Sequence, residues 1–203
     1  PPVNINRFEW NKPRDDFYLS VCRLVPNKRV DLLVRAFNRL KLPLVVVGNG
    51  VEKEYLQDIA GPTVKILGFQ SKEKIEKLMS RCRAFVYAGV EDFGIAPVEA
   101  MASGAPVIAL GKGGVLDTVK SFNSNSDEES TGLLFPDQTV KSLVEAIEFF
   151  KDKQLWRTLN PELIRKRSNF FSQDSFKKRF EETINRAWRE HINSCDIDTS
   201  DLI

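Results

Sequence analysis

The 203-residue sequence contains only one histidine and three cysteines. His191 alone supplies neither a metal cluster nor a histidine-based catalytic triad, because both need partner side chains. The cysteines are odd in number, and Cys22 and Cys82 lie in apolar patterns, which is typical of buried thiols and argues against a disulfide framework. We therefore expect a chemistry that uses neither a metal nor another cofactor.

An excess of charge of one sign is also missing. The chain has 30 basic and 28 acidic residues, which gives a net charge of +2. Such a balance gives no electrostatic reason to expect nucleic acid or a membrane surface as a partner. The sequence has no apolar run of membrane-spanning length and no secretory leader, so we expect a cytoplasmic protein without a transmembrane segment.

Short apolar runs alternate with amphipathic stretches along the chain. A chain of this length and near-average apolar content can bury one good core. Between the runs we expect helices, with Asp31 capping the first and Ser71 a later one. The predicted strands span residues 17–22, 44–47, 64–67, 84–88, 107–110 and 132–135. This alternation predicts an α/β, Rossmann-like fold: an open parallel six-stranded sheet with helices on both faces.

The order of the strands decides which loops meet. Of the two common orders for such sheets, 3-2-1-4-5-6 places the first and fourth strands side by side. Ligands bind at that reversal point, beyond the carboxyl ends of the strands. The loop after the first strand carries Arg23 and Lys28, and the loop after the fourth carries Glu91. We therefore expect these two loops to lie next to each other.

Residues 90–104 follow the fourth strand and predict a loop and then a helix of about two turns. Pro97 is tolerated near the start of a helix, and Gly104 stands where a left-handed cap would end it. The first N–H groups, at Phe93 to Ala96, have no partner within the helix, and the helix dipole adds partial positive charge there. Such an end binds anions or ligand oxygens.

Charged side chains surround this helix start. Glu91 and Glu99 bracket it, and we interpret them as acceptors for the hydroxyl groups of a sugar or ribose. In the alternative interpretation, Glu91 is a solvated loop acid and Glu99 a charge on the helix surface. Arg23 and Lys28 would suit a diphosphate, although two cations five residues apart are unremarkable in a chain with 30 basic residues.

Two motifs resemble a known family. Residues 91–108 read EDFGIAPVEAMASGAPVI, which resembles the Glu-x7-Glu signature of the family 4 retaining glycosyltransferases, enzymes of the GT-B fold. Residues 20–28 read SVCRLVPNK and resemble the family's Gly-Arg-Leu-x4-Lys motif, with Cys22 in place of the usual glycine. The resemblance covers roughly residues 1 to 190, nearly the whole chain.

The resemblance implies a role for each matching residue. Arg23 and Lys28 would bind the diphosphate of a nucleotide-sugar donor, and Glu99 would accept hydrogen bonds from its ribose. Glu91 and the backbone of Phe93, Gly94, Ile95 and Ala96 would hold the transferred sugar. The remaining donor-binding residues would be Gly48 and Asn49, which line the crevice, and Gly68, Phe69 and Gln70, which meet the base.

GT-B enzymes have two Rossmann-like halves, and the resemblance implies that this chain is the donor half. We expect an interdomain linker at 1–14, the donor domain at 15–172, a helix at 173–192 that returns toward the missing N-terminal half, and a disordered tail at 193–203. The acid pair Asp196 and Asp198 in that tail is interpreted as solvated. The missing half would bind the acceptor and would be the part that meets the inner membrane surface.

The implied reaction is retaining transfer of a sugar, with a UDP-hexose favoured over GDP-mannose, in bacterial polysaccharide or glycoconjugate synthesis. The chain alone is expected to be weakly active or inactive. The main rival is a non-catalytic, nucleotide-binding regulatory module. A dehydrogenase is a weaker rival, because no Gly-x-Gly-x-x-Gly follows the first strand. An epimerase of the GT-B type would need catalytic acids that the sequence does not identify.

Overall fold

The computed structural model describes residues 1–123 and 129–194, and the predicted loop at 121–130 and tail at 193–203 lie partly outside these ranges. Its sheet has six strands in the order β3-β2-β1-β4-β5-β6, and every neighbouring pair is parallel. The strands are β1 (Tyr18–Val21), β2 (Leu44–Val47), β3 (Val64–Ile66), β4 (Ala84–Tyr87), β5 (Val107–Leu110) and β6 (Gly132–Phe135). The predicted Rossmann-like fold and its strand order are confirmed.

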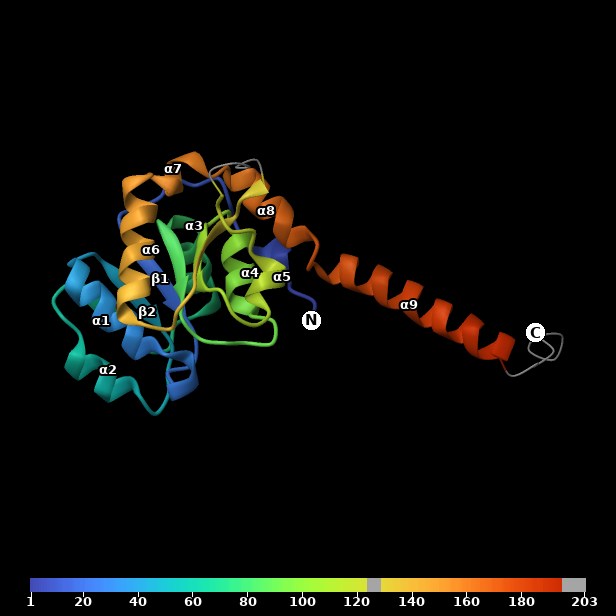
Figure 1. Ribbon diagram of the computed structural model, residues 1–203, viewed down its shortest axis with the longest axis horizontal. Coiled ribbons are helices and arrows are strands. Elements are labelled where there is room, and N and C mark those ends of the chain that lie inside the picture. The colour runs from blue at the N-terminus through green and yellow to red at the C-terminus, as the bar shows by residue number, and fades with distance from the viewer. Residues whose placement is uncertain (124–128, 195–203) are drawn as a thin grey trace.

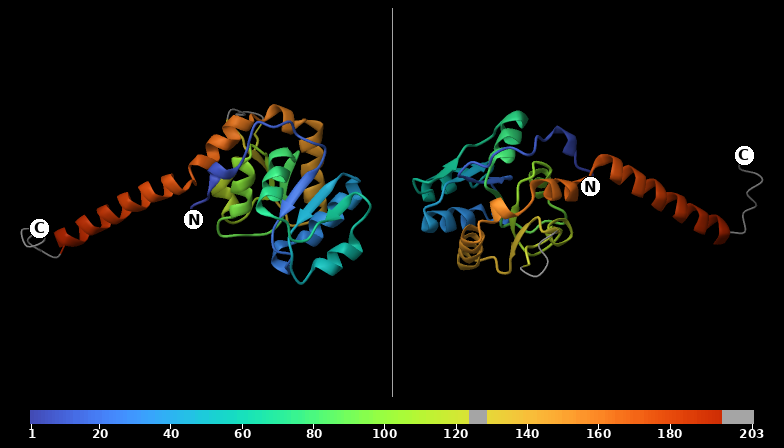
Figure 2. Two further views of the ribbon diagram at one scale, coloured as in Figure 1. Left: turned by 180° about the vertical axis from the view of Figure 1, so that it is seen from behind. Right: turned by 90° about the horizontal axis from the view of Figure 1, so that it is seen from above.

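Helices cover both faces of the sheet (Figures 1 and 2). On one face α1 (Val30–Leu40) packs against α6 (Val140–Asp152), with α2 (Lys53–Ile59) beside α1. On the other face α4 (Ile95–Ala102) packs against α3 (Lys72–Arg81) and α8 (Pro161–Asn169). The short helix α5 (Val115–Thr118) packs against α4, and α7 (Leu155–Thr158) packs against α6. Strands covered on both faces read as continuous apolar runs, as β4 and β5 do.

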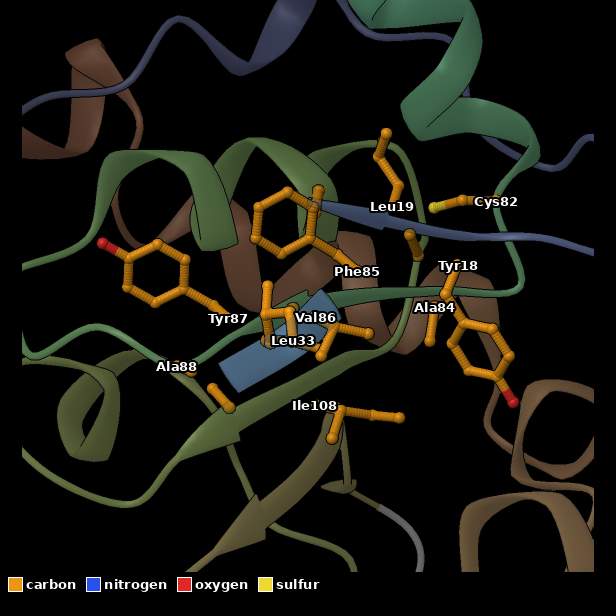
Figure 3. Packing of buried hydrophobic residues seen from close by; sticks show 14 of the residues in the cluster. Tyr18, Leu19, Leu33, Cys82, Ala84, Phe85, Val86, Tyr87, Ala88 and Ile108 are labelled. Atoms are coloured by element: carbon orange, nitrogen blue, oxygen red, sulfur yellow. The ribbon is translucent and has the colours of Figure 1, made fainter. Parts of the chain in front are cut away.

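The core is built from the two faces of β4. Figure 3 shows Phe85 and Tyr87 on one side of the strand and Val86 beside Leu33 of α1 on the other. All four side chains are buried. Successive strand residues point to opposite faces, so one short run fills two layers of the core. The hydroxyl of Tyr87 lies at the carboxyl end of the strand, where the site is built.

One predicted cap is wrong. Asp31 does not cap α1, because the 3-10 turn η2 (Pro26–Lys28) leads into the helix through Arg29, whose left-handed backbone (φ 52°) takes the cap position. Asp31 therefore falls in the first helical turn, where it accepts a hydrogen bond from Arg29 at 3.1 Å. Ser71 does cap α3, and its hydroxyl accepts a hydrogen bond from the backbone N–H of Lys74.

The N-terminal segment, predicted as an interdomain linker at 1–14, packs onto the folded body. Its residues Ile5–Arg7 form a 3-10 turn, η1. Val3, Ile5 and Phe8 are 2%, 5% and 3% exposed, and the N–H of Val3 donates to the carbonyl of Phe171 at 2.9 Å. Burial of these three apolar side chains stabilises the contact of the segment with the folded body.

Helix α9 (Gln173–Ser194) points away from that body (Figure 1). It runs two residues past its predicted end. Its apolar stripe is 39–56% exposed along its length and consists of Phe176, Phe180, Ile184 and Trp188. Among the helices in the described ranges, none is long and apolar enough to span a bilayer.

Candidate functional site

Two loops meet beyond the carboxyl ends of β1 and β4, as their parallel pairing requires. The Lys28 ammonium forms an ion pair with Oε1 of Glu91, and the two side chains are 16% and 30% exposed. Lys28 lies in η2 after β1, and Glu91 lies in the loop after β4. The predicted meeting of a cationic and an acidic loop at the reversal point is therefore present.

A cavity of about 400 Å³ opens at this meeting point. Its walls include Arg23, Lys28, Glu91 and the predicted backbone segment Phe93, Gly94, Ile95 and Ala96, joined by Pro1, Val21, Cys22, Tyr87, Asp92 and Pro97. A larger hollow of about 750 Å³ lies between β6 and α6, but none of the predicted site residues lines it. We place the site at the smaller cavity because Arg23, Lys28, Glu91 and the start of α4 converge there.

Tyr87 is a residue of this cavity that the sequence did not single out. Its hydroxyl donates a hydrogen bond to Oε1 of Glu91, the oxygen that Lys28 also contacts. Partial burial raises the pKa of Glu91, but the hydrogen bonds from Lys28 and Tyr87 outweigh it and leave the pKa below its ordinary value. Burial, and then the neighbouring carboxylate, raise the pKa of Tyr87. Glu91 is thus held as a carboxylate and Tyr87 as a neutral donor.

The start of α4 forms one wall of the cavity. Gly94 precedes the helix with a φ of 85°, a left-handed conformation that glycine adopts without strain. Among the described residues, no group accepts a hydrogen bond from the backbone N–H groups of Ile95 and Ala96. These two N–H groups and the positive end of the helix dipole are therefore available to an anionic ligand.

Paired glycines support the Glu91 loop from outside the cavity. Gly113 bridges Glu91, and the N–H of Gly114 donates to the Glu91 carbonyl at 2.8 Å. A Cβ on Gly114 would lie 2.2 Å from the carbonyl oxygen of Asp92, so only glycine allows this approach. The Gly-Gly pair was a visible signal of close backbone contact, but the sequence did not show which loop it would meet.

Glu99, predicted to bind the ribose, is not among the residues that line the cavity, and it lies one helical turn beyond Ile95. It shares a helix face with Ile95 and Ala96, which do line the cavity. Its Oε1 accepts from Arg7 at 2.5 Å, so its partner in this structure comes from the N-terminal segment. No sequence pattern indicated this ion pair, because 92 residues separate the two side chains.

The remaining predicted residues lie outside the cavity walls. Gly48 and Asn49 lie beneath the Arg23 loop, and the carbonyl of Asn49 accepts from the N–H of Leu24 at 3.0 Å. Gly68, Phe69 and Gln70 follow β3, two strands away from β1, and Phe69 is 83% exposed. Gly48 and Asn49 therefore support the Arg23 loop from outside the cavity, and the Phe69 side chain is exposed near the edge strand β3.

Two further features limit the chemistry of the site. Among the described residues, no group of three or more histidine, cysteine or acidic side chains is arranged to hold a metal ion. Cys22 lies in the cavity wall, and burial raises the pKa of its thiol to about 11, so it is protonated near neutral pH.

The fold and the site together define a Rossmann-like domain with a cationic and acidic cavity at the reversal point of its sheet. A family model described as "Glycosyl transferases group 1" matches residues 3–168, and the chain belongs to this family. The predicted membership is thereby confirmed.

Similar proteins agree with this assignment. Alpha-1,3/1,6-mannosyltransferase ALG2 of Kluyveromyces lactis is 26% identical, over 88% of this chain and 44% of its own. A GDP-mannose-dependent alpha-mannosyltransferase of Mycobacterium tuberculosis is 33% identical, over 64% of this chain and 32% of its own. The chain thus spans less than half the length of either relative.

Solved structures share the fold. Sucrose-phosphate synthase of Thermosynechococcus elongatus superposes with a TM-score of 0.76 and 24% identity, over 93% of this chain and 52% of its own. HepE of Anabaena, in complex with UDP and glucose, gives a TM-score of 0.73 and 21% identity, over 91% of this chain and 55% of its own. At these identities the likeness concerns the fold alone.

Proposed function

We propose that this chain is the donor-binding half of a retaining glycosyltransferase and binds a nucleotide-diphosphate sugar in the cavity between β1 and β4. The observation that supports the proposal most is the convergence of Arg23, Lys28 and the open start of α4 around one cavity. Two cations and a helix terminus form an electrostatic environment suited to a diphosphate.

The same groups would assist the reaction. When the bond between the sugar and the diphosphate breaks, the negative charge of the leaving group increases. Arg23, Lys28 and the N–H groups of Ile95 and Ala96 would stabilise that charge, a role that a metal ion has in other transferases. Glu91 would hold a hydroxyl group of the sugar, and Glu99 the ribose. No metal or other cofactor enters this proposal.

Lys28 and Glu91 pair with each other in this structure. A diphosphate that reaches Lys28 would compete with the carboxylate for the ammonium group and release Glu91 toward the sugar. Tyr87 would then keep the freed carboxylate in place through its hydrogen bond. Donor binding would thus exchange one ion pair for two ligand contacts.

Two classes of donor are compatible with the proposal, a UDP-hexose and GDP-mannose. The sequence favoured a UDP-hexose, and HepE binds UDP and glucose in its own structure. The relative from Mycobacterium tuberculosis is named for GDP-mannose, and its sequence identity of 33% exceeds that of HepE, 21%. We therefore propose GDP-mannose and UDP-glucose as the first two donors to test. A role in bacterial polysaccharide or glycoconjugate synthesis stays a prediction, as does a cytoplasmic location.

We also propose that turnover needs a second, acceptor-binding half. The ALG2 relative is more than twice as long as its matched part, and the relative from Mycobacterium tuberculosis is about three times as long. The exposed apolar stripe of α9 would pack against that half, because such a stripe is stable when covered by another surface. Efficient transfer by the isolated 203-residue chain would contradict this part of the proposal.

A thermal-shift panel of UDP, GDP, ADP and their sugar derivatives tests the proposal directly. We expect one nucleotide series to stabilise the chain, with a larger shift for the sugar derivative than for the bare diphosphate. Arg23→Ala should weaken the diphosphate far more than the matching nucleoside, whereas Arg39→Ala on the exposed side of α1 should change neither. An equal thermal shift for the nucleotide with and without the sugar would favour the rival, a non-catalytic nucleotide-binding module.

A further inference from the structure

A single arginine from the N-terminal segment joins two helices beside the site. Arg7 contacts Oε1 of Glu99 on α4 at 2.5 Å through one nitrogen and Oε1 of Glu76 on α3 at 2.9 Å through another. The three side chains are 27%, 19% and 23% exposed. Arg7 is thus the shared cation of two partly buried acids.

The position of Arg7 is fixed by its neighbours. It lies in η1 between the buried side chains of Ile5 and Phe8, and its guanidinium lies 4.4 Å from the centre of the Phe8 ring. Apolar burial on both sides of Arg7 holds the turn in place, so the guanidinium is presented from a rigid element. A guanidinium also fixes the direction of a carboxylate better than a lysine does, because its donors have a planar geometry.

Only one oxygen of Glu99 is used by this contact. Arg7 contacts Oε1, and among the described residues no donor reaches Oε2. Glu99 lies one helical turn beyond Ile95, on the face that lines the cavity. The carboxylate is therefore held on one side and open on the other.

Without Arg7, Glu76 and Glu99 would face each other as two acids with no cation between them. Two like charges at short range repel each other, so the two side chains would move apart. That movement would remove an oriented acceptor from the edge of the cavity.

We propose that Arg7 is a positioning residue of the donor site: it holds the Glu99 carboxylate in place so that the free oxygen Oε2 accepts a hydrogen bond from a ribose hydroxyl. This inference rests on the proposed function, since it assumes that a nucleotide occupies the cavity. It assigns a binding role to the segment that the sequence predicted to be an interdomain linker.

The test compares ribonucleotides with analogues that lack both ribose hydroxyls. The probe is UDP or GDP, whichever the wild-type chain binds, with the matching 2′,3′-dideoxynucleoside diphosphate measured by titration calorimetry. We expect Arg7→Ala to weaken the ribonucleotide about tenfold, the equivalent of one hydrogen bond to a charged group, and to leave the dideoxy analogue unchanged. Arg7→Lys should keep part of the affinity, and Arg39→Ala should keep all of it.

A double variant gives a second readout. If Arg7 acts through Glu99, adding Arg7→Ala to Glu99→Ala should cost no further affinity for the ribonucleotide. An additive loss would overturn the proposal, as would an equal loss for both ligands, which is the sign of a purely structural role. Tighter binding by Arg7→Ala would also overturn it, because Arg7 would then be blocking the site. Circular dichroism confirms that each variant folds.

The inference and the proposed function fail in different ways. If the wild-type chain binds no nucleoside diphosphate at all, the proposed function is lost. If it binds one and the loss in Arg7→Ala is absent, or is not specific to the ribose hydroxyls, only the role of Arg7 is lost.

Discussion

The two ends of α4 differ in whether the protein itself satisfies their backbone hydrogen-bonding groups. At its N-terminal end the backbone N–H groups of Ile95 and Ala96 face the cavity without an acceptor among the described residues. At its C-terminal end the carbonyl of Ala102 accepts from Arg165 at 2.5 Å, and that of Ser103 from Arg14 at 2.9 Å. One end of the same helix is open, and the other is closed by the protein's own cations.

This difference suggests that the N-terminal end of α4 serves ligand binding and the C-terminal end serves the stability of the fold. Every helix leaves N–H groups unpaired at its start and carbonyls unpaired at its end. Here arginines satisfy the carbonyls of Ala102 and Ser103, and backbone N–H groups satisfy those of Glu99, Ala100 and Met101. The N–H end is therefore the place where a ligand can satisfy the unpaired groups of the helix. We therefore expect substitutions near the closed end to change the free energy of unfolding, and substitutions near the open end to change donor binding.

The largest expected effect is at the closed end. Arg14 donates to the carbonyls of Met79, Ser80 and Ser103, so it joins the ends of α3 and α4. Arg14→Ala leaves these carbonyls without their charged donor and should lower the free energy of unfolding by about 2–4 kcal/mol. Urea denaturation measures this loss, with exposed Arg39→Ala as the control. An unchanged midpoint would show that the closed end does not support the fold.

The second effect concerns the open end. Gly114→Ala would place a Cβ 2.2 Å from the Asp92 carbonyl oxygen and 2.5 Å from the Phe93 Cα, so the loop before α4 must move. We expect a loss of stability of about 1–3 kcal/mol together with weaker nucleotide binding. Gly111→Ala is a matched control, because its Cβ would meet only ordinary contacts, at 3.5 Å. Equal nucleotide affinity in both variants would show that the loop before α4 does not contribute to nucleotide binding.

A smaller effect is expected from Tyr87→Phe, which removes the hydroxyl donor to Glu91 and keeps the ring. Nucleotide-sugar binding should weaken by about 1 kcal/mol, and binding of the bare diphosphate should change less, because Glu91 is proposed to hold the sugar. Titration calorimetry with both ligands measures the difference. Tyr55→Phe, which removes a hydroxyl from exposed α2, serves as the control and should alter neither affinity. The same loss of affinity for both ligands would show that Tyr87 does not act through the sugar contact of Glu91.

The thiols of Cys22 and Cys82 give the mildest test of the comparison between the two ends of α4. Burial raises the pKa of Cys22 at the open side to about 11, and that of Cys82 beside Arg14 to about 12. A raised thiol pKa lowers the reactive thiolate fraction at neutral pH, and that fraction grows about tenfold per pH unit until the pKa is reached. Iodoacetamide should therefore modify Cys22 slowly at pH 7.5 and faster as pH rises, while nucleotide protects it.

Peptide mass spectrometry resolves each cysteine in this experiment. Cys82 is fully buried, so the nucleotide should not alter its rate. Protection of Cys82 to the same extent as Cys22 would mean that the nucleotide stabilises the whole fold without covering the open end.

Much of the fold and part of the site were predictable. The apolar runs at β4 and β5 have the length and residue types of strands buried on both faces, and that local signal located the strands. Their order was predicted as one of the two common orders for such sheets, and the structure confirms it. The same order explains why Lys28 and Glu91 meet. By contrast, Asp31 was predicted as a cap from its residue type, and the left-handed backbone at Arg29 took that place, because the turn before α1 decides where the helix begins.

The partners of the side chains were not predictable. Tyr87 reads as one more apolar strand residue, and Arg7 as one of many exposed arginines. Their roles depend on Glu91 and Glu99, which become neighbours only when the chain folds.

The sequence by itself determined where the strands lie along the chain, the two motif loops and the family, because these follow from local apolar patterns and from short motifs of adjacent residues. Only the tertiary structure decided which charges neutralise each other: Lys28 with Glu91, and Arg7 with Glu99 and Glu76. Such pairs form between residues that are distant in sequence, since a charge at partly buried positions is stabilised by whichever opposite charge the fold brings within a few ångströms.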